Sequence, residues 1–123
     1  MALFNLVQNE THMELTWNEF ERVEMRVGTI TAVQDFPEAR KPAYQLTIDF
    51  GAAIGIRKSS AQITKHYRKE DLVGRQIVAV VNFPKKQIGP FMSECLVLGA
   101  VENGGGVILL HPGLAVDNGL RIG

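Results

Sequence analysis

The feature that most constrains this chain is a two-residue alternation of apolar and polar side chains that recurs in short segments. Residues 44–50 (YQLTIDF) show it most clearly, because apolar and polar residues alternate there without interruption. Successive side chains of a strand point to opposite faces of its sheet, so this segment is predicted to be a half-buried strand. Residues 25–33 alternate in the same way and predict a longer strand, in which Gly28 indicates a bulge or a bend.

Further strands are expected at residues 56–60, 76–83, 94–101 and 107–111. The apolar run of 76–83 is nearly continuous, which is typical of a central strand. The last two strands are joined by a glycine-rich turn. Residues 35–42 and 85–90 are expected to be loops because they combine prolines with charges, and the chain after residue 111 is expected to be mostly irregular.

Two short helical elements are also expected. Thr16 and Glu19 have the spacing of a capping box, which predicts a helix over residues 16–24. Its apolar residues recur every three positions and lie on one face, which must dock on something because so short a helix is not stable alone. One or two helical turns are expected over residues 61–67, with Ser60 as a possible cap.

The order of these elements predicts an all-β fold with short helices. Five or six strands, no βαβ unit and a helical element after the third strand indicate an OB-fold, a five-stranded antiparallel β-barrel, with N- and C-terminal additions. A β-sandwich would give a similar count of strands. Residues 1–12 show little periodicity and are set apart as an extension, whereas 13–123 are expected to form a single domain.

The charge of the chain is neutral as a whole and asymmetric along its length. There are 13 basic and 13 acidic residues, which argues against a general polyanion binder. Residues 1–26 nevertheless carry an excess of acidic side chains, and residues 57–86 carry an excess of basic ones. This asymmetry indicates a basic binding face, and the alternative is that the charges only solvate loops around the barrel.

No arrangement of residues typical of an enzyme is present. The three histidines lie far apart without zinc-ligand spacing, and the single cysteine, Cys95, sits in an apolar run where a buried thiol is expected. Asp49 and Glu94 could meet as a carboxylate pair, but an outward Asp and a strand-edge Glu are the simpler interpretation. We therefore expect no catalytic residue, no metal and no cofactor. We also expect a cytoplasmic protein without membrane insertion, because no apolar run approaches the length of a spanning helix.

Polar side chains that could contact a ligand gather between residues 59 and 94. They fall in three short stretches beside predicted strands, and the candidates are Ser59, Ser60, Gln62, Lys65, Asn82, Lys85, Lys86, Ser93 and Glu94. Such side chains donate hydrogen bonds to phosphates, and OB barrels bind single-stranded or looped nucleic acid with one face and its flanking loops. The alternative is that Asn82 and Ser93 only satisfy loop backbone groups.

Six blocks of the sequence carry a family resemblance: residues 25–30 (MRVGTI), 36–43 (FPEARKPA), 48–51 (IDFG), 54–64 (IGIRKSSAQIT), 81–84 (VNFP) and 93–99 (SECLVLG). Together they resemble the CsaA family of export-related chaperones. The wider superfamily is the tRNA-binding domain found at the C-terminus of some methionyl-tRNA synthetases.

The resemblance implies a non-enzymatic molecular chaperone of protein export that acts as a homodimer. Its implied partners are unfolded precursor polypeptides and the export ATPase SecA. The alternative is a module that binds tRNA or structured RNA on the same barrel face. Mapping that face by motif adds Arg26 to the candidates above.

Two apolar sets complete these expectations. An unfolded polypeptide needs an apolar groove with a few polar groups, and the candidates around the basic loops are Phe36, Pro37, Phe83, Ile88 and Phe91. The apolar faces of the N-terminal helix and of the C-terminal strand exceed what one small barrel can cover. A two-fold interface is therefore expected to use Trp17, Phe20, Val23, Val107, Ile108, Leu109 and Leu110.

Overall fold

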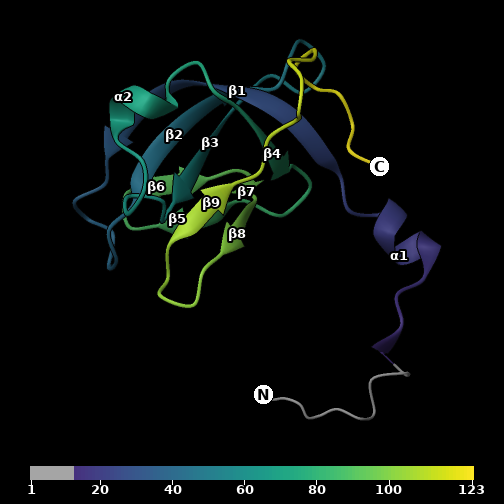
Figure 1. Ribbon diagram of the computed structural model, residues 1–123, viewed down its shortest axis with the longest axis horizontal. Coiled ribbons are helices and arrows are strands. Elements are labelled where there is room, and N and C mark those ends of the chain that lie inside the picture. The colour runs from purple at the N-terminus through teal and green to yellow at the C-terminus, as the bar shows by residue number, and fades with distance from the viewer. Residues whose placement is uncertain (1–12) are drawn as a thin grey trace.

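Residues 13–123 are described by the computed structural model shown in Figure 1, and the extension 1–12 lies outside the described residues. The elements, in chain order, are α1 (Trp17–Glu21), β1 (Met25–Asp35), β2 (Tyr44–Asp49), β3 (Ile56–Ala61), α2 (Lys69–Leu72), β4 (Gln76–Val80), β5 (Lys86–Ile88), β6 (Phe91–Ser93), β7 (Leu96–Val97), β8 (Gly99–Val101) and β9 (Val107–Leu109).

One five-stranded antiparallel sheet, in the order β3-β2-β1-β4-β7, curls into a nearly closed barrel (Figure 1). The long strand β1 organises it. Its first half, Met25–Thr29, pairs with β4, and its second half pairs with β2. This confirms the predicted all-β architecture of the OB type, with short helices. Within the described residues, no helix is long and apolar enough to cross a bilayer.

The bulge in β1 lies further along the strand than the sequence suggested. The pairing with β2 shifts between Ile30 and Ala32, whereas Gly28 keeps a regular partner in β4. Gly28 is needed for another reason. A Cβ atom there would lie 2.6 Å from the Cγ2 of Ile48 and 2.7 Å from the Cδ1 of Phe50, so its missing side chain lets β1 pass close to the core.

Side chains from β1, β2, β4 and α2 fill the barrel. The alternation of buried and half-exposed positions predicted for β2 is confirmed, and β4 is buried except at its first residue. The largest fully buried side chains are apolar: Phe50, Ile30, Leu46, Ile48, Leu72, Ile77 and Val27. Burying each one contributes about 1.5–3 kcal/mol, so this core is the main source of stability.

The N-terminal helix has the predicted start and an earlier end. The backbone N–H of Glu19 donates to Thr16 Oγ1 at 3.2 Å and that of Thr16 donates to Glu19 Oε1 at 2.8 Å, which completes the capping box. The helix ends at Glu21 instead of continuing to residue 24. The chain joins the barrel by residue 24, because the N–H of Val81 donates to the carbonyl of Glu24.

The second helix lies beyond the predicted segment 61–67. Ala61 is still paired in the sheet, opposite Tyr44, and Ile63 is buried, so the chain stays extended there before a turn. The helical residues are Lys69–Leu72, where Leu72 inserts fully into the core. The sequence therefore predicted a helical element between the third and fourth strands correctly and misplaced it along the chain.

Two segments near the C-terminal half also differ from expectation. The predicted loop 85–90 is the first half of a hairpin, in which β5 pairs with β6 around the turn Gly89-Pro90. The predicted strand 94–101 divides into β7 and β8. The division falls at Leu98, whose N–H donates to Val78 of the sheet while its carbonyl accepts from Leu110 beyond β9.

The C-terminal segment was expected to be mostly irregular, and part of it forms an added edge beside β1. The N–H of Val27 donates to the carbonyl of Leu120 at 3.0 Å, and the N–H of Gly119 donates back to Val27 at 2.7 Å. The N–H of Ile122 donates to Met25 at 2.9 Å. These bonds cover the part of the β1 edge that β2 leaves free, as a sheet edge requires.

Candidate functional site

The hairpin β5–β6 stands between two hollows of the surface. The first, which we call the hairpin groove, has a volume of about 910 Å³ and lies between β5, the loop 38–43 and the end of β3 at Ser60 and Gln62. The second, which we call the Phe83 pocket, has about 420 Å³ and is lined by Phe83, Pro84, Lys85, Lys86, Ser93, Cys95 and Leu96. Lys86 is the one residue that lines both.

The hairpin groove carries uncompensated positive charge. Arg40, Lys41 and Lys86 line it together with a single carboxylate, that of Glu38. Within residues 13–123, none of these four side chains has an oppositely charged group within 4.0 Å. The groove is thus suited to a ligand that brings acidic groups.

The Phe83 pocket is mostly apolar. Phe83 is 55% exposed and Leu96 is 48% exposed, so both offer apolar surface to a ligand. Burial raises the pKa of the Cys95 thiol to about 12, so it stays protonated and uncharged and does not act as a nucleophile. Lys85 stands at the pocket, with its Nζ 3.6 Å from Glu94 Oε2.

Several residues predicted to contact a ligand instead close the barrel, because they join β3 to residues 93 and 94 at the end of β6. The N–H of Glu94 donates to the carbonyl of Lys58 at 2.8 Å, and the N–H of Lys58 donates to Glu94 Oε1 at 3.0 Å. The N–H of Ser60 donates to Ser93 Oγ at 3.3 Å. Ser59 is only 1% exposed, so it does not reach a ligand on the outer surface, contrary to the prediction.

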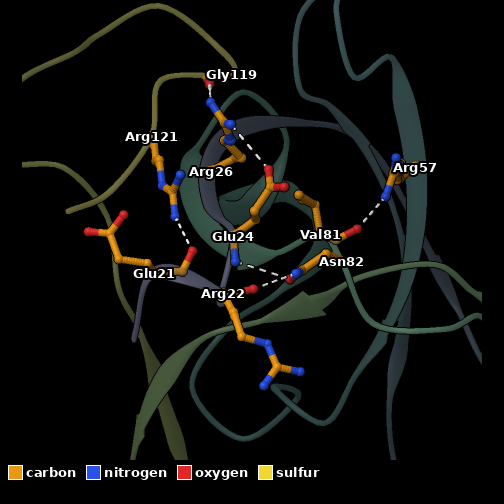
Figure 2. Close-up of polar contacts among 9 residues, drawn as sticks. All are labelled: Glu21, Arg22, Glu24, Arg26, Arg57, Val81, Asn82, Gly119 and Arg121. Carbon is orange, nitrogen blue, oxygen red and sulfur yellow. Dashed lines mark hydrogen bonds and ion pairs between the residues drawn. The ribbon is translucent and has the colours of Figure 1, made fainter. Parts of the chain in front are cut away.

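Arg26 and Asn82 lie together at another place on the barrel, where they hold both ends of the described chain (Figure 2). Asn82 Nδ2 donates to the carbonyl of Arg22 at 2.6 Å, and its Oδ1 accepts from the N–H of Glu24 at 3.0 Å. Arg26 donates to the carbonyl of Gly119 and to the Glu24 carboxylate, both at 3.1 Å. Both Asn82 contacts are thus with backbone groups, which is the alternative to ligand contact that the sequence left open for this residue.

Lys65 lies apart from both hollows, beside the turn of the other hairpin, β8–β9. A Cβ on Gly104 would be 3.2 Å from its Nζ. The neighbouring His66 contacts Glu102 of the same turn, with Nε2 2.7 Å from Oε1. This hydrogen bond lowers the pKa of the Glu102 carboxyl. The ten predicted polar residues therefore do not form one face, and among them only Ser60, Gln62, Lys85, Lys86 and Ser93 line a hollow.

The predicted apolar groove does not exist as one surface. Phe36 and Phe91 are buried in a small second core, with ring centroids 5.3 Å apart and planes tilted by 56°. They attach the loop after β1 to the hairpin and offer no free surface. Ile88 lines the hairpin groove, Phe83 lines the other pocket, and Pro37 is exposed but lines neither hollow.

The residues predicted for a dimer interface also differ in exposure. Trp17 is 85% exposed, and Ile108 and Leu110 are 41% and 46% exposed. Val23 is exposed as well, whereas Phe20 and Val107 are half-buried. Leu109 is 5% exposed and belongs to the barrel core, so it is not available to a partner. The alternation within β9 explains this, because Leu109 points inward and its neighbours do not.

Sequence reasoning did not identify the residues of the loop 38–43 or Gln87 and Leu96 as parts of the site. Arg40 and Lys41 were visible only as loop charges, and nothing local shows that their loop folds onto a hairpin 45 residues later in the chain. Within the described residues, no group of three His, Cys, Asp or Glu side chains is placed to hold a metal ion.

The comparisons with known proteins agree with this architecture. Residues 25–121 match the family described as "Putative tRNA binding domain". The barrel and this match thus define a non-catalytic binding domain, and the chain belongs to this tRNA-binding domain family.

Among solved structures, two chaperones resemble the chain along its length. The chaperone CsaA of Bacillus anthracis is 50% identical with a TM-score of 0.85, and the CsaA chaperone of Picrophilus torridus is 51% identical with a TM-score of 0.84. Each covers 89% of this chain, and 99% and 100% of the respective structures is matched.

Curated relatives include much longer enzymes. The methionine–tRNA ligase of Bacteroides fragilis is 31% identical over 108 residues, which is 88% of this chain and 16% of the ligase. The chain therefore spans only a small part of the ligases that it matches. The comparisons support a chaperone or tRNA-binding role for the chain, as the sequence blocks had indicated.

Proposed function

We propose that the protein is a non-enzymatic molecular chaperone that binds unfolded polypeptides as a homodimer. The observation that carries the proposal is the pair of hollows around the hairpin β5–β6, one mostly apolar and one basic. Unfolded chains expose apolar side chains, and concave sites with apolar walls and a few polar groups suit them. The similarity to two CsaA chaperones over nearly the whole of their chains supports it.

The homodimer is supported by apolar side chains that one barrel leaves uncovered. Trp17 on α1, Val101 on β8 and Leu114 near the C-terminus are 85%, 77% and 81% exposed. The helix α1 projects away from the barrel (Figure 1), so its apolar face is available to a second copy. A two-fold contact would cover these residues on both subunits at once.

Binding is tested with a labelled, permanently unfolded polypeptide, followed by fluorescence anisotropy. We expect saturable binding with micromolar affinity and no binding of the same polypeptide in its native fold. Light scattering measures the assembly in parallel. Trp17→Glu should shift it from twice the monomer mass to the monomer mass, whereas Val73→Glu, at another exposed apolar position, should not. Absence of binding to the unfolded polypeptide would refute the proposed function.

A second candidate function is tRNA binding, which the family match and the three unpaired cations of the hairpin groove favour. It requires affinity that falls steeply with salt, because phosphate contacts release counterions. Replacing Lys85 and Lys86 by Ala should then weaken binding of any RNA and flatten its salt dependence. An export-related role and SecA as a partner are expectations from the family resemblance, and a cytoplasmic location is an expectation from the sequence. We carry all three as part of the chaperone proposal.

A further inference from the structure

We propose that the hairpin β5–β6 selects client segments in which an apolar side chain lies close to acidic residues. The apolar side chain would occupy the Phe83 pocket, and the carboxylates would lie in the hairpin groove. The inference rests on the proposed polypeptide-binding function and adds the chemistry of the segment that is bound.

The two hollows are close enough for one short segment to fill both. Lys86 opens β5 and lines the Phe83 pocket on one side and the hairpin groove on the other. An extended polypeptide rises about 3.3 Å per residue, so side chains a few positions apart can enter the two hollows together. The hairpin therefore reads a short pattern of residues and not a single side chain.

The apolar half of the pattern follows from the Phe83 pocket. Phe83 and Leu96 are about half exposed, and the buried Cys95 thiol beside them carries no charge at neutral pH. An aromatic or branched aliphatic side chain placed there would cover apolar surface that water now contacts. The gain is proportional to the apolar area removed from water.

The acidic half follows from the charge of the hairpin groove. Arg40, Lys41 and Lys86 have no carboxylate within 4.0 Å among residues 13–123, and Glu38 is the only acidic residue of the groove. Lys85 differs, because Glu94 lies 3.6 Å from it. A client segment with carboxylates would complement the three free cations, and a basic segment would be repelled by them.

The backbone of β5 favours a polypeptide over a nucleic acid strand. The pair Ile88–Phe91 flanks the two-residue turn, so this pair exchanges both hydrogen bonds and the pair Gln87–Met92 exchanges none. The N–H and C=O of Gln87 consequently point away from β6, and they have no other backbone partner within the described part of the chain. An extended polypeptide can pair with them, as peptides do at free sheet edges.

The test uses three labelled peptides of about 12 residues, ~40 Å when extended. All share one Phe in a Gly/Ser/Thr background, and they carry Glu, Gln or Lys at two positions close to it. Anisotropy at low and high salt is measured with the full-length wild type, Lys86→Gln and Phe83→Ala. Lys65→Gln and Val73→Ala serve as matched controls, since both residues lie outside the two hollows and outside the proposed dimer contact.

We expect the Glu peptide to bind most tightly and the Lys peptide least. Lys86→Gln should weaken the Glu peptide about threefold to fivefold and leave the Gln peptide unchanged, as one partly exposed ion pair implies. Phe83→Ala should weaken both about tenfold. The two control variants should bind like the wild type, and high salt should reduce only the advantage of the Glu peptide.

Equal binding of the three peptides overturns the inference and leaves the chaperone proposal standing. If no peptide and no unfolded polypeptide binds, the proposed function itself has failed. If single-stranded RNA of similar length binds more tightly than the Glu peptide, and Lys86→Gln weakens only the RNA, the groove serves nucleic acid and the inference is overturned in favour of the second candidate function.

Discussion

Replacing Asn82 by Ala decides whether this residue contacts a ligand or anchors the N-terminal helix. The change removes two hydrogen bonds that tie the segment after α1 to the barrel, at 2.6 Å and 3.0 Å. Each is worth about 0.5–1.5 kcal/mol. The Asn82 side chain is exposed, so water can replace both bonds and the lower part of that range applies. We expect a loss of about 1–2 kcal/mol in the free energy of unfolding.

The free energy is measured by urea denaturation of wild type and Asn82→Ala, with Asn103→Ala as a control at an exposed turn position. Asn82→Asp keeps the acceptor for the N–H of Glu24 but turns a carboxylate oxygen toward the carbonyl of Arg22, so it should lower the free energy of unfolding at least as much as Asn82→Ala. Binding of the unfolded polypeptide is measured on the same samples. If Asn82→Ala has the free energy of unfolding of the wild type but no longer binds the polypeptide, the anchoring role is refuted and Asn82 is a ligand contact.

Three further predictions concern the barrel and its second hairpin. Gly28→Ala should destabilise the fold by about 1–3 kcal/mol in urea denaturation, because the new methyl group would overlap core side chains, whereas Gly113→Ala, in open space, should be neutral. With its pKa raised to about 12, Cys95 should react with iodoacetamide at pH 8 only as fast as the protein opens, and rapid labelling of the folded protein would contradict its burial. The hydrogen bond from His66 lowers the pKa of Glu102, so this contact stabilises the turn above the ordinary glutamate pKa and is lost as the pH falls through the lowered value. An NMR titration should show a low midpoint that His66→Ala raises to the usual range.

The strands and the fold class could be predicted because they depend on local patterns. The alternation of residues 44–50 and the capping box at Thr16 are visible within a few positions, and the structure confirms both. The bulge, the position of α2 and the hairpin β5–β6 depend on distant partners. Ala61 stays extended because Tyr44 lies opposite it, and no local signal around residues 61–67 conveys that pairing.

The candidate site could be predicted only as a region. Short polar side chains beside strands suit two purposes, because Ser, Asn and Glu satisfy backbone groups as readily as they contact a ligand. Ser93, Glu94 and Asn82 are used in the first way, to close the barrel and to hold its ends. Within residues 13–123 the Lys86 side chain has no such backbone partner, which is why the long basic side chains of the region remain the better candidates for ligand contact.

The aromatic residues first expected to touch a client contribute to the site indirectly. Phe36 follows β1 and Phe91 begins β6, and their contact fixes the loop 38–43 against the hairpin. That contact is what brings Arg40 and Lys41 to the same groove as Lys86, although these residues are far apart in the sequence. A small apolar core of this kind converts scattered charges into one basic surface. Replacing either ring by a small side chain would therefore separate Arg40 and Lys41 from Lys86 without removing any of the three charges.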